Sequence, residues 1–305
     1  MIKRTRIFDL DLINDKNFDE TISSILNFNK EYDESSGLLP LLFTPNVDDV
    51  VKLNEKQYAD LSAILKRSYY ILPDGQPVIW ASKLLGKKLE SRLPGSELFP
   101  LLWKAVIHEN KRVMVVAPSP EVGELLKKEY PSLEYYVPPF FDVNNPDELK
   151  NVITGASEIF DKIKPDYVFI GIRFPKQNHI ALGLIEHFKK SQSQSQSQSL
   201  NPEPRTQNPE LRTQNPELRT QNPELRTQNS EPRTQNSEHR MPLFLLMGAS
   251  YEFYLNLKKR APKFWQKTGM EWFYRFTQEP GRLFRRYFVD DMQFFPIVWR
   301  EFRKK

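Results

Sequence analysis

The chain of 305 residues contains no cysteine, and histidine is scarce. The absence of cysteine excludes disulfide bonds and thiolate metal sites, and it makes a reducing cytoplasm the expected compartment. The histidines show no spacing typical of metal ligands; they are His108, His179, His187 and His239. We therefore expect neither a metal ion nor another cofactor.

Long apolar runs are also missing. The longest stretches, at 38–43 and 242–247, are far shorter than the roughly 18 residues that a membrane-spanning helix needs. The N-terminus is basic but has no apolar run of signal-peptide length. We therefore expect no transmembrane span and no leader.

Three common enzyme motifs are absent as well. The chain has no GxGxxG, no GxxxxGK[ST] and no GxSxG nucleophile elbow. These absences weaken the case for an NAD-dependent enzyme, a P-loop kinase or an α/β-hydrolase.

Apolar residues make up only 39% of the chain, and the deficit lies in residues 191–240. This segment begins with SQSQSQSQSL and continues with a seven-residue repeat close to NPELRTQ. A coiled coil also has a period of seven, but most of these units carry a proline, which breaks a helix interior. The composition cannot bury enough apolar surface to offset the entropy of ordering. We predict that 191–240 is a disordered, charge-balanced insertion in a surface loop, and a binding role for the repeat stays open.

Outside the insertion, short apolar runs alternate with amphipathic stretches. The runs expected to form strands are 6–12, 38–43, 68–72, 112–117, 133–137, 167–172 and 242–248. Helical periodicity separates them, for example at 47–68 and 96–110. Such alternation predicts an α/β fold with a mostly parallel sheet flanked by helices on both faces. We assign residues 1–190 and 241–257 to this core.

Residues 258–305 have a different composition, with thirteen Lys or Arg, five acidic residues and thirteen aromatic residues. We expect a helical appendage here, and two interpretations of its aromatic residues stay open. They could pack on the core, or they could form a basic interfacial surface for an anionic membrane. A nucleic-acid-binding tail is a third interpretation, but the chain carries no recognised nucleic-acid motif.

Polar residues follow three of the expected strands, and ligands of open parallel sheets bind beyond the carboxyl ends of strands. These residues are Thr44 and Asn46, then Asp74 and Gly75, and finally Lys176. Each also has a structural interpretation. Thr44 and Asn46 are good helix caps, Asp74-Gly75 is a common turn, and Lys176 could simply be solvated.

These segments, together with others, resemble a known family. The resemblance is carried by TPNVDDVV, LPDGQPVIWASKLLG, RLPGSELFP, GIRFPKQN, MGASYEF, KRAPKFWQKTGMEWFYRF and QEPGRLFRRY. They are similar to the WecG/TagA/CpsF glycosyltransferase family, which includes wall teichoic acid N-acetylmannosaminyltransferases. The similarity covers nearly the whole chain except the repeat. It implies a Rossmann-like α/β domain whose C-terminal helical appendage meets the membrane.

The resemblance also implies a reaction. This is the inverting, metal-independent transfer of a hexosamine-type sugar from a UDP-sugar to a saccharide on undecaprenyl diphosphate, in cell-surface polysaccharide biosynthesis. The implied partners are the UDP-sugar, the lipid-linked acceptor and an anionic membrane surface contacted by 258–305. No nucleic acid is expected, and an oligomer stays open. The expected location is cytoplasmic and peripheral, on the inner face of the plasma membrane.

The family's functional residues can be carried over one by one. Asp74 falls on the position of the catalytic base, and Arg275, Arg282 and Arg285 match arginines of the appendage that complete the site. Pro280-Gly281 should break the helix between Arg275 and the other two. The full substrate-binding set that we predict is Thr44, Asn46, Gly75, Arg92, Gly171, Lys176, Gln177, Gly248, Glu252, Arg275, Arg282 and Arg285.

Three positions depart from the family pattern. Glu97 and Glu252 stand where the family usually has Asp, and Asn178 stands where it usually has Glu. Residues that line a sugar pocket set donor and acceptor choice through hydrogen bonds. Two alternatives therefore stay open: a divergent homologue that uses another UDP-hexose, and a non-catalytic protein that binds a nucleotide sugar or a lipid diphosphate.

Overall fold

A computed structural model describes residues 2–199, 240–259, 261–262, 264–265 and 268–304, without the side chains of 195–199 and of Arg282. Its centre is a six-stranded parallel sheet of order β4-β3-β8-β7-β5-β6. The strands are β3 (Leu39–Phe43), β4 (Ser68–Ile71), β5 (Val113–Val116), β6 (Glu134–Tyr136), β7 (Tyr167–Ile170) and β8 (Leu243–Leu246). The predicted α/β fold with a parallel sheet is confirmed.

Two hydrophobic clusters cover the two faces of the sheet. Alternate strand residues point to opposite sides, so Leu41 and Phe43 join one cluster while Leu42 joins the other. The first face is covered by α3 (Val47–Lys52), α4 (Ala59–Leu65), α5 (Gln76–Leu84), α8 (Pro146–Ile163), α9 (Lys176–Ser199) and α14 (Phe294–Arg303). The second face is covered by α1 (Asp19–Leu26), α2 (Phe28–Glu31), α6 (Gly95–His108), α7 (Pro120–Glu129) and α10 (Ser250–Tyr254). The central strands β5, β7 and β8 are apolar because both of their faces are buried.

The first expected strand, 6–12, is wrong. The chain instead forms an antiparallel hairpin of β1 (Arg4–Ile7) and β2 (Leu10–Ile13), which is a separate two-stranded sheet. Phe8 and Asp9 make the two-residue turn, both with φ of 57°. Apolar residues alternate on both sides of this turn, so the sequence pattern does not reveal the reversal.

The expected helix at 47–68 is also wrong in its length. It is divided into α3, a 3₁₀ turn η2 (Lys56–Tyr58) and α4, and Ser68 already belongs to β4. The break follows Leu53. Here the side-chain nitrogen of Asn54 donates to the backbone carbonyl oxygen of Val50 at 2.9 Å. A side chain that bonds to the backbone competes with helix continuation.

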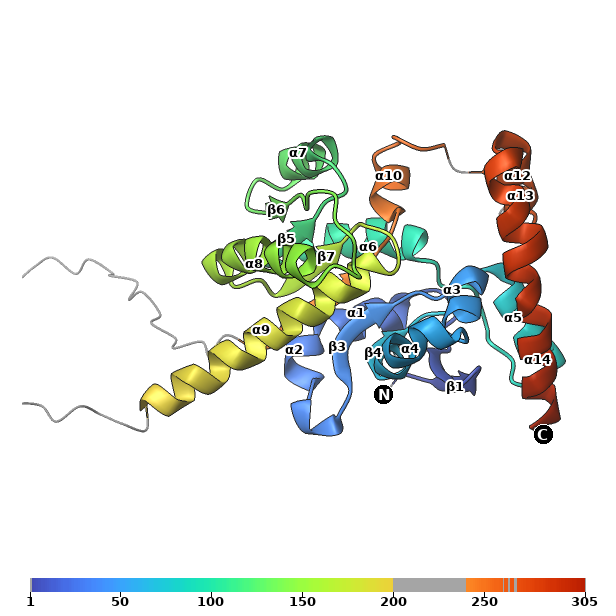
Figure 1. The fold of residues 1–305 in the computed structure, drawn as a ribbon, viewed down its shortest axis with the longest axis horizontal. Helices are drawn as coiled ribbons and strands as arrows, with labels where there is room; N and C mark the ends of the chain where they lie inside the picture. The colour runs from blue at the N-terminus through green and yellow to red at the C-terminus, as the bar shows by residue number, and fades with distance from the viewer. Residues whose placement is uncertain (1, 200–239, 260, 263, 266–267, 305) are drawn as a thin grey trace, which may run out of the picture.

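Helix α9 continues to Ser199, nine residues beyond the boundary expected for the insertion. The expectation of disorder is therefore wrong for 191–199. Ser191 and Ser193 donate their hydroxyls to carbonyl oxygens one turn back, and the first proline comes only at Pro202, so the helix can propagate. Figure 1 shows this end of α9 projecting from the body. Residues 200–239 lie outside the described part of the chain.

The C-terminal appendage is helical, as predicted, and lies against the face of the core that carries α3 and α5 (Figure 1). It contains α12 (Glu271–Gln278), α13 (Pro280–Arg285), a π-helical turn η3 (Arg286–Asp290), a 3₁₀ turn η4 (Asp291–Gln293) and α14. The break expected at Pro280 separates α12 from α13. Within the described ranges, no helix has the length and apolarity needed to cross a bilayer.

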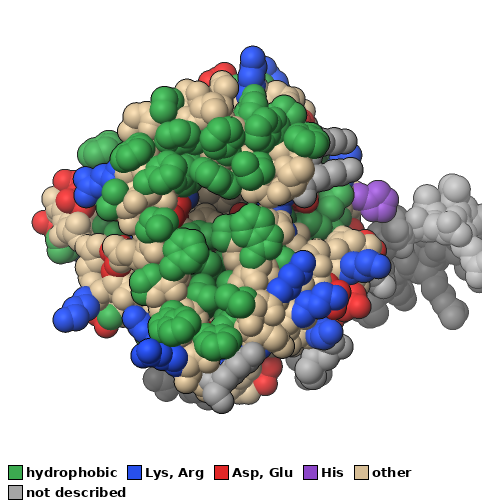
Figure 2. Space-filling model, turned by 90° about the vertical axis from the view of Figure 1, so that its right-hand side faces the viewer, with side chains coloured by type: hydrophobic (Ala, Val, Ile, Leu, Met, Phe, Trp, Pro, Cys, Tyr) green, Lys and Arg blue, Asp and Glu red, His purple; other side chains and the backbone are tan. Residues whose placement is uncertain are grey.

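The aromatic residues of α14 lie on two sides of the helix, one buried against the core and one exposed. Phe294 is buried and its ring centre lies 5.3 Å from that of Phe8 in the hairpin turn. On the outer side, Phe295 is 64% exposed and Trp299 57% exposed. Figure 2 shows that such hydrophobic side chains gather on the face formed by the appendage and α5. We call this the apolar face; its exposed members are Trp80, Leu84, Phe284, Phe288, Val289, Met292, Phe295, Trp299 and Phe302.

Candidate active site

The polar residues that follow β3 and β4 are brought together at the carboxyl end of the sheet. The backbone N–H of Asp74 donates to the carbonyl oxygen of Pro45 at 3.1 Å, which ties the two loops to each other. Gly75 has a φ of +88°, a conformation that favours glycine, and it begins α5. A Cβ at Gly75 would lie 3.9 Å from the Cβ of Asn46. Asp74, Gly75 and Asn46 therefore occupy one small region.

Asn46 has a structural role in the loop. Its side-chain oxygen accepts from the N–H of Asp49 at 3.3 Å, and the Asp49 carboxylate accepts from the N–H of Asn46 at 3.0 Å. This reciprocal capping box begins α3. The helix-cap interpretation thus holds for Asn46, and its amide nitrogen points to no partner that the structure records.

Thr44 lies where three elements converge. A Cβ at Gly95, the first residue of α6, would lie 3.2 Å from the hydroxyl oxygen of Thr44 and 3.2 Å from that of Ser250. Glycine at this position lets the end of β3, the start of α6 and the start of α10 approach one another closely. Thr44 therefore packs beside the loop that follows β8.

The ends of β7 and β8 are joined in the same way. The side-chain oxygen of Gln177 accepts from the N–H of Gly248 at 3.2 Å. A Cβ at Gly171 would lie 1.9 Å from the ring of Tyr251, so only glycine fits there. Gln177, Gly171 and Gly248 therefore shape the backbone at this edge of the sheet.

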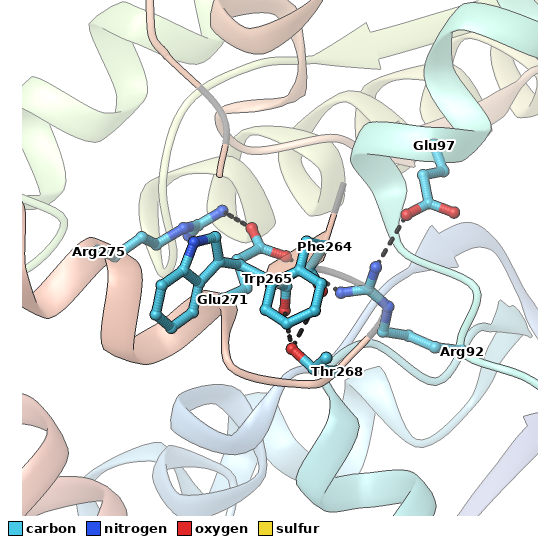
Figure 3. Close-up of polar contacts among 7 residues, drawn as sticks. All are labelled: Arg92, Glu97, Phe264, Trp265, Thr268, Glu271 and Arg275. Carbon is cyan, nitrogen blue, oxygen red and sulfur yellow. Dashed lines mark hydrogen bonds and ion pairs between the residues drawn. The ribbon is translucent and has the colours of Figure 1, made fainter. Parts of the chain in front are cut away.

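Charged side chains from the core and the appendage meet one another (Figure 3), and three of them act electrostatically on Asp74. Arg92 donates to Glu97 of α6 at 2.9 Å and to Glu271 of α12 at 3.2 Å. Glu271 also accepts from Arg275 at 2.5 Å. We call Arg92, Glu97, Glu271 and Arg275 the charged network. It joins α12 to the core through Arg92, whose side chain is only 17% exposed.

The charged network and burial together shift the pKa of Asp74. Its partial burial raises its pKa above the ordinary value, and the negative charge of Glu271 raises it further. The positive charges of Arg92 and Arg275 oppose the shift, as does the N–H of Gly75. Three predicted site residues, Asp74, Arg92 and Arg275, are thus electrostatically coupled.

Several predicted residues lie elsewhere. The ammonium nitrogen of Lys176 lies 4.4 Å from the ring centre of Phe140, over the loop that follows β6. Glu252 binds Lys258 at 2.5 Å, at the start of the connection to the appendage. Arg285 is exposed at the end of α13 and makes no ion pair with a described side chain. Arg282 lies in α13, but its side chain is outside the described set.

The structure also draws attention to residues outside the predicted substrate-binding set. Glu271 was part of the recognised C-terminal segment, and its spacing of four from Arg275 is typical of a helical ion pair. Asp49 fits the N-x-x-D pattern of a capping box. Asn178 is completely buried, and neither polar atom of its amide has a hydrogen-bond partner among the described residues. No sequence pattern indicates that last feature.

Two further observations concern ligands. Among the residues for which positions are described, no three of His, Asp and Glu gather as a metal site would require. A hollow of about 470 Å³ with five basic lining residues lies between the β1–β2 hairpin and the end of α14; they are Lys3, Arg6, Lys87, Lys88 and Lys304. This hollow is separate from Asp74.

Comparison with known proteins gives a consistent result. The family model of the "Glycosyl transferase WecG/TagA/CpsF family" matches residues 5–193 and 228–305, and it omits most of the repeat. A relative from Staphylococcus aureus (strain MRSA252) is 24% identical over 217 residues, which are 70% of this chain and 62% of that protein. A relative from Bacillus spizizenii (strain W23) is 24% identical over 227 residues, which are 72% of this chain and 65% of that protein.

Both relatives are named N-acetylglucosaminyldiphosphoundecaprenol N-acetyl-beta-D-mannosaminyltransferase. The chain spans a little less than two thirds of the length of each. The family match, by contrast, covers both the sheet and the appendage. The chain therefore belongs to the WecG/TagA/CpsF glycosyl transferase family.

Proposed function

We propose that this chain is an inverting glycosyltransferase. It transfers a hexosamine-type sugar from a UDP-sugar to a saccharide on a polyprenyl diphosphate, in the biosynthesis of a cell-surface polysaccharide. One observation carries the proposal: a partly buried carboxyl group, Asp74, lies at the carboxyl end of the sheet and is coupled to a guanidinium of the core and one of the appendage.

Asp74 is the general base in this proposal. The acceptor hydroxyl attacks the anomeric carbon, the bond from that carbon to the UDP oxygen breaks, and the hydroxyl proton passes to Asp74. A single in-line displacement inverts the anomeric centre, so one carboxylate is sufficient. A positioned base contributes about 10²–10⁴ to the rate. The raised pKa of Asp74 supports this role, because it makes the carboxylate a stronger base than an exposed aspartate.

Arg92 and Arg275 are proposed to stabilise the leaving nucleotide. Negative charge develops on the diphosphate of UDP as the sugar departs. Guanidinium groups bind phosphate oxygens through two parallel hydrogen bonds, and fixed donors of this kind stabilise a transition state most in a partly desolvated site. With two such cations the proposed reaction needs no metal ion.

We further propose that the protein works while docked on the inner face of the plasma membrane. The apolar face carries exposed aromatic side chains on a segment with thirteen basic residues, a combination suited to the headgroup region of an anionic membrane. Docking through the appendage would bring α12, with Glu271 and Arg275, to the lipid-linked acceptor. Lipid binding and chemistry would then depend on the same element.

The sugar that is transferred is the least constrained part of the proposal. The names of the relatives favour N-acetylmannosamine and an acceptor that ends in N-acetylglucosamine. Glu97, which replaces the usual aspartate, bonds to Arg92, so this departure changes the charged network itself. Another UDP-hexose is the alternative donor. A protein that binds a nucleotide sugar or lipid diphosphate without turnover is the alternative function.

A donor screen tests the proposal. The full chain is incubated with vesicles that contain polyprenyl-diphosphate-linked N-acetylglucosamine and, in turn, with each of a panel of UDP-hexoses and UDP-hexosamines. Mass spectrometry of the lipid fraction should show an added N-acetylhexosamine with one donor. If no donor yields product and UDP still binds, the non-catalytic alternative is favoured.

A further inference from the structure

Glu271 occupies an unusual place in the charged network. Its Oε1 accepts from the Nη2 atom of Arg275 at 2.5 Å, and its Oε2 accepts from the Nη1 atom of Arg92 at 3.2 Å. One carboxylate therefore bridges two guanidiniums that come from different parts of the molecule (Figure 3). The side chain of Glu271 is only 14% exposed.

The pairing with Arg275 alone would be unremarkable, because residues four apart on a helix often form an ion pair of small energy. The contact with Arg92 is different. Arg92 lies in the segment between α5 and α6, so this bond crosses from the core to the appendage. Glu97, the other partner of Arg92, is 38% exposed and lies on the core side. Among the hydrogen bonds of the described residues, those of Glu271 reach both arginines.

The charges in this region do not favour an additional anion. Among these five described side chains, Asp74, Glu97 and Glu271 carry three negative charges when ionised, and Arg92 and Arg275 carry two positive charges, so the set has a net charge of −1. The diphosphate of a UDP-sugar would add negative charge to the same two guanidiniums. A carboxylate and a phosphate both accept paired hydrogen bonds from a guanidinium, so they compete for it.

We propose that the carboxylate of Glu271 holds the place of the diphosphate. When no nucleotide is bound, it keeps Arg92 and Arg275 positioned; when the diphosphate arrives, it is displaced from both guanidiniums. Glu271 is thus a positioning residue. It orders the two arginines, but the nucleotide binds more weakly because it must displace the carboxylate. This inference rests on the proposed nucleotide-sugar function and extends it to the regulation of nucleotide binding.

Displacement would also affect the base. The charge of Glu271 raises the pKa of Asp74. Loss of that charge should lower the pKa of Asp74, so that the base stays ionised to a lower pH.

The test compares Glu271→Gln with Glu97→Gln. Each variant removes one acidic partner of Arg92, but only the first removes the bridge to Arg275. UDP binding is measured by calorimetry on the full chain, and kcat/KM is measured against pH with the active donor.

For Glu271→Gln we expect UDP to bind about tenfold more tightly, which corresponds to about 1.4 kcal/mol. We also expect the acid limb of the profile to move to lower pH. For Glu97→Gln we expect a change in UDP affinity of less than about threefold.

Unchanged or weaker UDP binding in a folded Glu271→Gln protein would overturn the proposal and leave Glu271 as a clamp, whether or not the acid limb moves. If Glu271→Gln does not fold, Glu271→Asp replaces it. That side chain keeps its charge but is one methylene too short to reach both guanidiniums, so UDP should bind about threefold more tightly. Unchanged binding would then overturn the proposal. The calorimetric measurement of UDP binding needs no turnover. It therefore tests the role of Glu271 even if the proposed transfer reaction does not occur.

Discussion

Two aspartates near the ends of neighbouring strands, Asp49 and Asp74, both have raised pKa values, but their surroundings differ. Asp49 is 8% exposed, and its carboxyl group caps α3. Asp74 is more exposed and is coupled to Arg92 and Arg275. A carboxyl group fixed in a helix cap cannot reach a substrate, whereas one placed beside two cations can act on an anionic ligand. The surroundings, and not the residue type, separate the structural group from the proposed base.

Asp49 gives a prediction for stability against pH. Burial raises its pKa to about 7, far above that of an unfolded aspartate. The fold therefore favours the protonated form, and the stability that this group contributes is present below about pH 4 and is lost as the pH rises toward 7. Asp49→Asn keeps an acceptor for the cap but does not titrate. We expect its Tm, relative to that of the natural chain, to rise by about 5 °C between pH 4 and pH 8.

Thermal unfolding followed by circular dichroism checks this prediction, and Asp60→Asn on the exposed side of α4 is a suitable control. A Tm difference that does not change with pH would mean that Asp49 is ionised in the fold.

Sequence reasoning placed candidate site residues at the correct point of the fold where a short motif fixed the backbone. Asp74-Gly75 was found because a strand, a turn and a helix start are each visible in the pattern. Glu271 was missed because its role depends on contact with Arg92, which lies far away in the chain. Lys176 was selected for its position at a helix start, but its direction is set by Phe140 and Phe141 of another loop. Contacts between distant segments are not encoded in local spacing.

At the scale of elements, the loop that contains Asn46 caps α3 and also lies at the candidate active site, so one residue can affect both stability and activity. Asn46→Ala removes the side-chain acceptor for the N–H of Asp49, and we expect a loss of about 1 kcal/mol in the free energy of unfolding. Asn46→Ser retains an acceptor and should lose much less. Denaturant unfolding of the two variants measures the difference.

The same pair of variants separates the two interpretations of Asn46. If Asn46 is only a cap, Asn46→Ser should transfer sugar at close to the natural rate. If Asn46→Ser is as stable as the natural chain but loses activity, the side chain contacts substrate as well.

The central parallel strands were the most predictable elements, because burial on both faces makes them continuously apolar. β5, β7 and β8 are wholly buried, and each was expected within a residue or two of its observed bounds. The elements that were wrong depend on weaker signals. The β1–β2 turn has no glycine or asparagine to mark it, and the helix break after Leu53 depends on one asparagine. The end of α9 depends on how far a polar helix propagates, which composition does not fix.

At the scale of the whole molecule, the apolar face predicts membrane binding. We expect the double variant Phe295→Ser, Trp299→Ser to bind vesicles of anionic phospholipid at least about tenfold more weakly, because two exposed aromatic groups that could enter the headgroup region are lost. Phe140→Ser is a matched control, since Phe140 is 93% exposed but lies outside the apolar face. Co-sedimentation with vesicles measures both. Equal binding of the double variant and the control would contradict docking through α14.

The insertion should contribute little to the stability of the molecule. The family model passes from residue 193 to residue 228, so relatives complete the fold without the intervening repeat. Closing a long surface loop costs little free energy, so its removal should change the free energy of unfolding only slightly. We expect deletion of 194–227 to change Tm by less than about 5 °C, and differential scanning fluorimetry checks this. A larger loss would indicate that the repeat packs against the core.

In the proposed reaction, Asp74 takes the proton of the acceptor hydroxyl. The most direct test is the rate of sugar transfer by Asp74→Asn at saturating donor and acceptor, measured together with its affinity for UDP. We expect the rate to fall by about 10²–10⁴ while the UDP dissociation constant stays within about threefold of the natural value. A transfer rate within about twofold of the natural chain would contradict it.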